Sequence, residues 1–264
     1  MQILAGVGAG VSRVSVAGYA AGGQDVSSRL TRIDKIAFPS DTKSTLTPTL
    51  SNQVQYNAGF ADSGVAGYSA GGNDPSVNVI DKISFPGDTK STLVATTTSI
   101  IYSAAGFANS GVAGYIAGGF SDATSLAVNR VDKIAFPSDT KSTITDTLTS
   151  TSELHCGFAD YGVAGYVAGG QDSAATALDR IDRIAFPSDT KSTIAAVLAT
   201  VNTQSPAGFA DTGVAGYIAG GFSTVRLDRI DKLSFPSETR TTLSPAVLTT
   251  ATRRLCGFAD CGVL

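Results

Sequence analysis

The sequence predicts an all-β protein with a single domain, in which a unit of about 50 residues is repeated five times. One segment, GVAGYIAGG, stands at residues 111–119 and 213–221, with close copies at 64–72 and 162–170 and a more divergent one at 15–23. The double glycines that end these copies are 49, 47, 51 and 51 residues apart. Thr, Ser, Val, Ile and Gly dominate the units, and these residues are weak helix formers.

Each unit divides into four short strands: GFAD, VAGYIAGG, RIDKIAF and TKSTL. Asp-Ser-Gly joins the first two as a tight hairpin, and Phe-Pro-Ser-Asp joins the last two. The third strand has Ile33 and Ala37 on one face and Ile36 and Phe38 on the other, so each sheet is expected to pack between two neighbours. The small residues of VAGYIAGG suit close backbone approach, which predicts that it is an inner strand.

Four strands repeated about every 50 residues are typical of a β-propeller, so we predict a ring of five four-stranded blades. The first-strand element occurs more often than five blades need, because GFADCGVL ends the chain and GVSRVS at 10–15 is a divergent copy. We expect the C-terminal copy to close the ring beside residues 15–23, with the N-terminal copy as the alternative. The predicted parts are a lead segment at 1–13, repeats at 14–58, 59–105, 106–156, 157–207 and 208–256, and a closing strand at 257–264.

The composition makes several function classes improbable. The net charge is −3 and no basic stripe occurs, which argues against nucleic acid as a partner. No apolar run reaches the roughly 18 residues that cross a bilayer, and no signal peptide is recognisable, so we expect no membrane insertion. Cys156, Cys256 and Cys261 are expected to be small buried thiols, because an odd number of cysteines does not suit a disulfide framework.

Catalytic residues are scarce in this chain. His155 is the one histidine, too few for a metal site or a Ser-His-Asp triad, and we expect it at the surface or between blades. The glycine-rich runs lack the helix and the Lys-Ser/Thr of a phosphate-binding loop. We therefore predict no catalytic residues, no metal site and no cofactor.

Three polar side chains recur in every unit. The strand acids are Asp34, Asp81, Asp132, Asp182 and Asp231. The turn acids are Asp41, Asp88, Asp139, Asp189 and Glu238. The tyrosines are Tyr19, Tyr68, Tyr115, Tyr166 and Tyr217.

One interpretation is that the repeated acids form five equivalent cation or ligand sites. We favour another, in which the turn acids accept nearby backbone N–H groups and the strand acids pair with basic residues or cap loops. The tyrosines are expected to pack between blades with their hydroxyl groups satisfied, rather than to surround a pocket.

One face of the predicted ring is more variable than the other. The loops between the second and third strands have 9, 7, 11, 10 and 8 residues and differ in content, whereas the turns on the opposite face hardly vary. Varied loops on a constant frame are how binding surfaces are often built, with neutral drift as the alternative explanation. Phe120 and Phe222 are candidate exposed anchors there. The candidate binding residues are Gln24, Asp25, Asn73, Asp74, Phe120, Asp122, Gln171, Asp172 and Phe222.

The unit resembles the kelch repeat. An apolar strand ending in Gly-Gly is followed by a strand and turn at 131–140 and by a Leu-containing segment. The chain has no Trp, where kelch units carry one in the fourth strand, and the Phe before each Pro, as at Phe38, is expected to fill part of that volume. The GYxxGG, (I/V)DKI and DT elements look like those of a kelch-like variety seen in bacteriophage particle proteins.

This resemblance implies a non-catalytic binding or structural module of a virion, made in the host cytoplasm. A tail fibre, a baseplate or a surface-decorating protein would each fit, with other virion proteins or host-surface glycan as partners and homo-oligomers possible. Two alternatives stay open: a bacterial lectin-like propeller with several sugar pockets, at the cell surface, and a cytoplasmic protein-interaction scaffold.

Overall fold

The computed structural model describes residues 17–251 except 39, 200–203 and 245, and these residues form only β-strands, turns and loops. No helix in this part of the chain is long and apolar enough to span a membrane.

Sheet 1 contains β1 (Ala17–Ala21), β2 (Ile33–Ala37) and β3 (Thr42–Thr45). Sheet 2 contains β4 (Ala58–Asp62), β5 (Ala66–Ala70), β6 (Ile80–Ser84) and β7 (Thr89–Thr92). Sheet 3 contains β9 (Ala105–Asn109), β10 (Ala113–Ala117), β13 (Val131–Ala135) and β14 (Thr140–Thr143). Sheet 4 contains β16 (Cys156–Asp160), β17 (Ala164–Ala168), β19 (Ile181–Ala185) and β20 (Lys191–Thr193). Sheet 5 contains β21 (Ala207–Asp211), β22 (Ala215–Ala219), β23 (Ile230–Ser234) and β24 (Thr239–Thr242).

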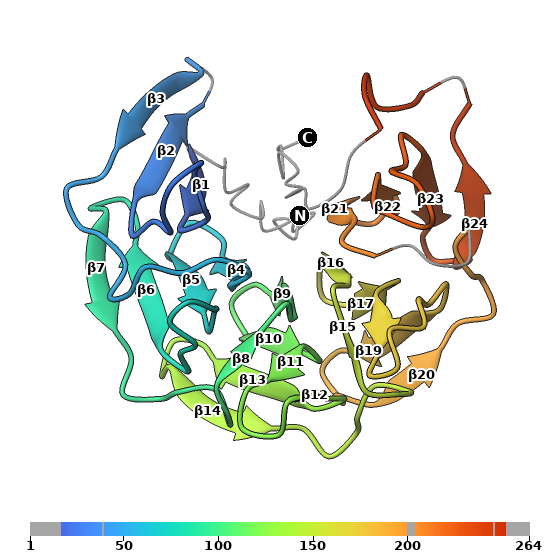
Figure 1. Cartoon of the computed structure of the whole chain (residues 1–264), viewed down its shortest axis with the longest axis horizontal. Coiled ribbons are helices and arrows are strands. Elements are labelled where there is room, and N and C mark those ends of the chain that lie inside the picture. The colour runs from blue at the N-terminus through green and yellow to red at the C-terminus, as the bar shows by residue number, and fades with distance from the viewer. Residues whose placement is uncertain (1–16, 39, 200–203, 245, 252–264) are drawn as a thin grey trace, which may run out of the picture.

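The four predicted strands of a unit are confirmed in sheets 2 to 5, and the described residues of sheet 1 contain three of them. Each of these sheets is antiparallel with its strands in chain order. The third strand is buried on both faces as expected, since Ile181 and Ile184 point to opposite sides of β19 and both are fully buried. The five sheets stand side by side around a common centre (Figure 1). The predicted lead segment at 1–13, the closing strand at 257–264, and both copies proposed to complete sheet 1 lie outside the described residues.

VAGYIAGG is an inner strand, as predicted, but it is not the innermost one. The strands nearest the centre are β4, β9, β16 and β21, which carry GFAD or its variants, and the VAGYIAGG strands lie one position further out (Figure 1). The innermost backbones meet at glycine: a Cβ atom on Gly106 would lie 2.2 Å from the carbonyl oxygen of Gly59, and one on Gly157 would lie 2.5 Å from that of Gly106. The closest backbone approach therefore occurs at the Gly of GFAD. A single glycine in a short strand predicts such an approach less clearly than the run of small residues in VAGYIAGG does.

The glycines of the VAGYIAGG strands serve a different contact. A Cβ atom on Gly114 would lie 2.1 Å from the ring of Phe60, which comes from the innermost strand of the preceding sheet. Gly165 receives Phe107 and Gly216 receives Phe158 in the same way. Each sheet thus inserts one aromatic ring into a space that a glycine of the next sheet leaves open.

Aromatic rings continue this packing across each boundary. Phe60 and Tyr68 are cross-strand partners in sheet 2, with ring centroids 5.0 Å apart, and Phe136 of sheet 3 stacks on Tyr68 at 5.2 Å. The pairs Tyr19–Phe85, Tyr115–Phe186 and Tyr166–Phe235 repeat the stacking at 4.7–5.3 Å. Phe85, Phe136, Phe186 and Phe235, each of which precedes a proline, therefore fill space between sheets.

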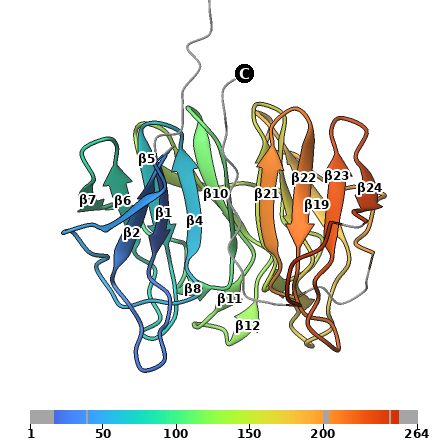
Figure 2. The ribbon, with the colours of Figure 1, turned by 90° about the horizontal axis from the view of Figure 1, so that it is seen from above.

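The loops that join the second and third strands lie on one edge of the sheets, together with the connections between sheets (Figure 2). Short strands that the sequence did not reveal pair these segments. β8 (Ile101–Tyr102) pairs with β11 (Phe120–Ser121), which also pairs with β12 (Leu126–Ala127), and β15 (Ser152–Glu153) pairs with β18 (Gln171–Asp172). In sheets 2 to 5, the residue after Gly-Gly is thereby fixed to the connection that precedes its sheet.

Candidate functional site

Four of the five strand acids are buried, and Asp34 is half-buried. Asp182 accepts hydrogen bonds from the backbone N–H and hydroxyl of Thr149, 3.0 and 2.6 Å away, and from the Thr193 hydroxyl at 2.7 Å. Arg180 lies 3.1 Å from the same carboxylate. Burial raises the pKa of Asp182, but the hydrogen bonds from Thr149 and Thr193 outweigh it and hold the pKa below its ordinary value. The expectation that strand acids pair with basic residues and cap a neighbouring loop is confirmed.

The turn acids have different partners from those predicted. Asp139 accepts from the Tyr68 hydroxyl at 2.8 Å and from the Lys82 ammonium at 2.6 Å, both on the preceding sheet, rather than from nearby backbone N–H groups. Its φ of 55° aims the carboxylate across the boundary. Asp88, Asp189 and Glu238 make the equivalent contacts. Tyr19, Tyr68, Tyr115 and Tyr166 are thus packed between sheets with their hydroxyls satisfied, as expected.

A third set of polar contacts was not foreseen. Asp62 ends the innermost strand of sheet 2 and accepts the backbone N–H of Gly111, in the first turn of sheet 3, at 2.7 Å. Asn109 and Asp160 accept from the equivalent glycines of sheets 4 and 5, at 3.1 and 2.7 Å. In the sequence these side chains resemble ordinary turn residues, because their acceptor role depends on the next sheet. Among the described residues, no group of three or more His, Cys, Asp or Glu side chains is placed to hold a metal ion.

The predicted binding residues lie in the loops on the face opposite the constant turns, and the structure does not gather them into one pocket. Asp25 and Asp172 each fold their own loop by accepting backbone N–H groups two to four residues onward. Asp74 forms an ion pair with Arg29, which joins the loops of sheets 1 and 2. The exposed residues of the set are Gln24, Asp25, Asp74 and Asp122, and the half-buried ones are Asn73, Phe120, Gln171, Asp172 and Phe222.

The two phenylalanines are therefore not the exposed anchors that the sequence suggested. Phe120 is half-buried because it pairs with Tyr102 in β8, with ring centroids 5.1 Å apart. The apolar side chains that do project are Val26, Leu126 and Val225, which are 105, 54 and 63% exposed at the tips of three of these loops. Nothing in the sequence around these three residues predicts that they are exposed. Loop length and variability could identify the loops but not the projecting side chains.

No family model and no curated protein matches this chain. The kelch-like assignment therefore rests on the repeat motifs alone.

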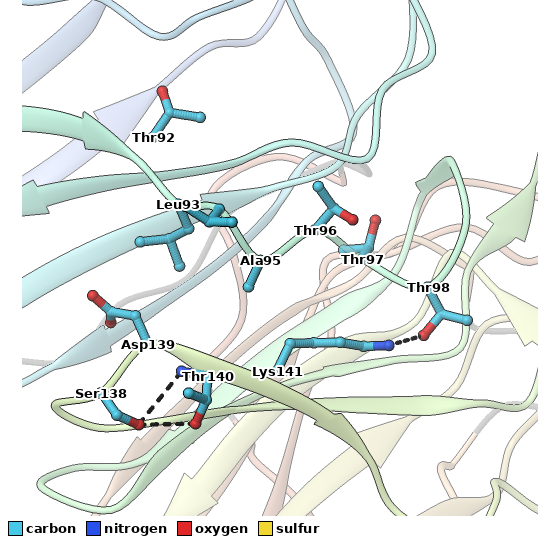
Figure 3. A pocket seen from close by; sticks show the side chains of 11 residues that line it. Thr92, Leu93, Ala95, Thr96, Thr97, Thr98, Ser138, Asp139, Thr140 and Lys141 are labelled. Carbon is cyan, nitrogen blue, oxygen red and sulfur yellow. Dashed lines mark hydrogen bonds between the residues drawn. The ribbon is translucent and has the colours of Figure 1, made fainter.

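A groove on the outer rim was not predicted. It has a volume of about 830 Å³ and lies between the last strand of sheet 2, with the segment that follows it, and β14 of sheet 3 (Figure 3). Its lining is rich in hydroxyl groups, and Lys141 extends along it to donate a hydrogen bond to Thr98. Val94 is fully exposed at this groove. The lining residues are Thr92, Leu93, Val94, Ala95, Thr96, Thr97, Thr98, Ser138, Asp139, Thr140 and Lys141.

His155 lies between sheets 3 and 4, as one of the two expected placements had it. Its Nε2 atom is 3.0 Å from the Ser152 carbonyl oxygen, and the ring sits against Gly118 of sheet 3. Burial, with a smaller contribution from the charge of Arg180, lowers the pKa of His155 to about 4, although Ser152 and Asp182 act in the opposite direction. Cys156 is likewise a buried free thiol, as expected.

We expect His155 to make the fold sensitive to pH between about 6.5 and 4. The unfolded chain takes up the proton first as the pH falls, so the stability that is complete above pH ~6.5 decreases by about 3 kcal/mol on the way to pH ~4. His155→Ala, which introduces the residue that Ala104 provides in the preceding repeat, should lose much less stability over this interval. Urea unfolding of both proteins at several pH values measures the difference, and equal losses would contradict the expectation.

Proposed function

We propose that this chain is a five-bladed, kelch-like β-propeller that serves as a non-catalytic binding module of a bacteriophage particle. Its variable loops contact host-surface glycan, and its constant frame contacts neighbouring virion proteins. The observation that carries the proposal is the contrast between the two faces: loops of 7 to 11 residues with unlike contents stand on one face, and nearly invariant turns stand on the other.

The contacts between sheets support this division of roles. At the described boundaries between sheets, the strand acids, turn acids and tyrosines hold neighbouring sheets together, so these polar residues are accounted for by the frame. The loops, in contrast, project Val26, Leu126 and Val225 into solvent. Exposed apolar side chains surrounded by polar residues are typical of interaction sites.

Loop replacement tests the proposal. Residues 121–126 and 223–226 are replaced by short Gly-Ser turns, which keeps the pairing of Phe120 with Tyr102 and that of Phe222 with Gln204. Binding of the purified protein to a panel of bacterial cells and to their extracted polysaccharides is then measured, with and without a chelator. We expect saturable binding to a few strains that the replacement reduces about tenfold or more.

A matched control comes from the opposite face. Tyr161 is 56% exposed in a turn where the equivalent residues are Ser63 and Ser110, so Tyr161→Ser should leave binding unchanged. Binding that survives the loop replacement would overturn the assignment of the ligand to this face. Loss of binding in the presence of the chelator would instead indicate that binding needs a cation, held by some of the acidic residues.

Ring closure has its own test. At the described boundaries a turn acid accepts from a tyrosine and a basic residue of the preceding sheet, so a closed ring would bring Asp41 of sheet 1 to Tyr217 and Lys232 of sheet 5. Asp41→Ala should then lower the free energy of unfolding by about 1–2 kcal/mol, as much as Asp88→Ala. Urea unfolding measures both. An effect of Asp88→Ala without one of Asp41→Ala would contradict closure through this contact.

A further inference from the structure

The groove between sheets 2 and 3 has equivalents at the other boundaries, and a comparison of them indicates what it binds. Sheets 3 and 4 are joined in the same way: Lys141 and Lys191 both lie 3.7 Å from a strand acid, and each donates to a threonine hydroxyl of the preceding connection. The difference lies in one residue of the connection. Asp146 stands four residues after Ser142, and Ala95 stands four residues after Ser91.

Asp146 fills the equivalent of the groove with a carboxylate. It accepts the backbone N–H of Lys191 at 2.7 Å, on the outer edge of β20. Lys141 has the same register on β14, opposite Ile134, that Lys191 has on β20, opposite Ile184. Because N–H directions alternate along a strand, the Lys141 N–H also points away from its sheet, toward Ala95. Among the described residues, no side chain accepts this N–H.

The remaining boundaries are occupied differently. Pro48 stands at the equivalent place between sheets 1 and 2. Ala196 stands there between sheets 4 and 5, where the Arg240 guanidinium turns to the carbonyl oxygen of Val197 at 2.9 Å. The boundary between sheets 2 and 3 thus combines a small residue, a lysine and an open groove.

We propose that this groove binds an acidic sugar, a hexuronate unit of a polysaccharide, whose carboxylate takes the place that Asp146 occupies at the next boundary. The inference goes beyond the proposed function, because it adds a separate glycan site on the outer rim, apart from the variable loops. The carboxylate accepts the Lys141 N–H, close to the Lys141 side chain. The sugar hydroxyls meet those of Thr96, Thr98 and Thr140 (Figure 3).

Size and charge agree with this ligand. A volume of about 830 Å³ exceeds what a carboxylate alone needs and is within the range of pockets that hold small molecules. Val94 offers an exposed apolar contact for the C–H face of a sugar ring. Asp139 in the lining does not exclude an anion, because Lys82 neutralises it at 2.6 Å, and Asp189 is paired with Lys133 in the same way beside Asp146.

The test uses trigalacturonate as the probe and its methyl ester as the matched ligand that lacks the charges. Titration calorimetry of the full chain should show binding of the acid that is at least about tenfold tighter than that of the ester. Ala95→Asp, which copies the residue of the next repeat, should weaken the binding of the acid about tenfold or more and leave the fold intact. Asp146→Ala should open a second groove and raise the amount of trigalacturonate bound per chain.

Three results would overturn the inference: equal binding of acid and ester, unchanged affinity in Ala95→Asp, or binding of an aspartate trimer in preference to the sugar. Circular dichroism and thermal unfolding of each variant establish that it is folded. Since Ala95→Asp leaves the variable loops untouched, its failure is separate from that of the proposed function, which the loop replacement tests on whole cells.

Discussion

Replacing Asp182 with alanine should lower the free energy of unfolding by about 3–5 kcal/mol. The carboxylate is 1% exposed and accepts two hydrogen bonds from Thr149 and one from Thr193. Its removal leaves Arg180 and the Thr149 N–H without their acceptor in a buried place, and the loss of desolvated partners costs more than the loss of one exposed contact. Urea unfolding at pH 7 measures the change.

Asp34 is the matched control for this variant. It occupies the same position in sheet 1 and binds Thr45, but its carboxylate is 18% exposed. Asp34→Ala should therefore cost much less than Asp182→Ala, and equal costs would contradict the role of burial. The pKa of Asp182 is held low in the folded state, so its contribution is complete above about pH 4 and is lost as the pH falls further.

The repeat made most of the fold predictable. Short apolar runs bounded by Gly, Pro and Asp located the four strands of each unit, and the two buried faces of IDKIA indicated that each sheet has two neighbours. The order of strands from the centre was not predictable in the same way. Small residues occur in both GFAD and VAGYIAGG, and their use differs: one set lets backbones approach, and the other receives the rings of Phe60, Phe107 and Phe158.

The partners of the polar residues were only partly predictable. The strand acids lie beside basic residues in the sequence, as Arg180 and Asp182 do, and the ion pair follows from that spacing. The turn acids bind a tyrosine and a lysine more than 50 residues away, as Asp139 does with Tyr68 and Lys82. Such a contact depends on how neighbouring sheets are placed, which local patterns do not report.

The proposed binding surfaces could likewise be predicted from the sequence only in part. Variable loop length identified the loop face, but the pairing of Phe120 with Tyr102 and the projection of Val26 depend on the path of each loop. The rim groove arises where Ala95 replaces the acid that Asp146 supplies in the next unit. Positions at which one repeat differs from the others, such as Ala95, are therefore the places to search for ligand sites in this chain.

Replacing Gly106 with alanine should lower the free energy of unfolding by about 3 kcal/mol. The added Cβ atom would lie 2.2 Å from the carbonyl oxygen of Gly59 and 2.9 Å from its carbonyl carbon, which are backbone atoms of the neighbouring innermost strand. A flexible side chain could move away from such a contact, but backbone atoms cannot, so the two sheets must separate. Their separation also disturbs the packing of the Phe60 ring against Gly114.

Gly87→Ser is the control, because that turn glycine has no neighbour closer than 4.0 Å and the equivalent residues are serines. Urea unfolding should show a lower midpoint for Gly106→Ala and no change for Gly87→Ser. An unchanged midpoint in Gly106→Ala would mean that the innermost strands do not meet as closely as this arrangement of sheets requires.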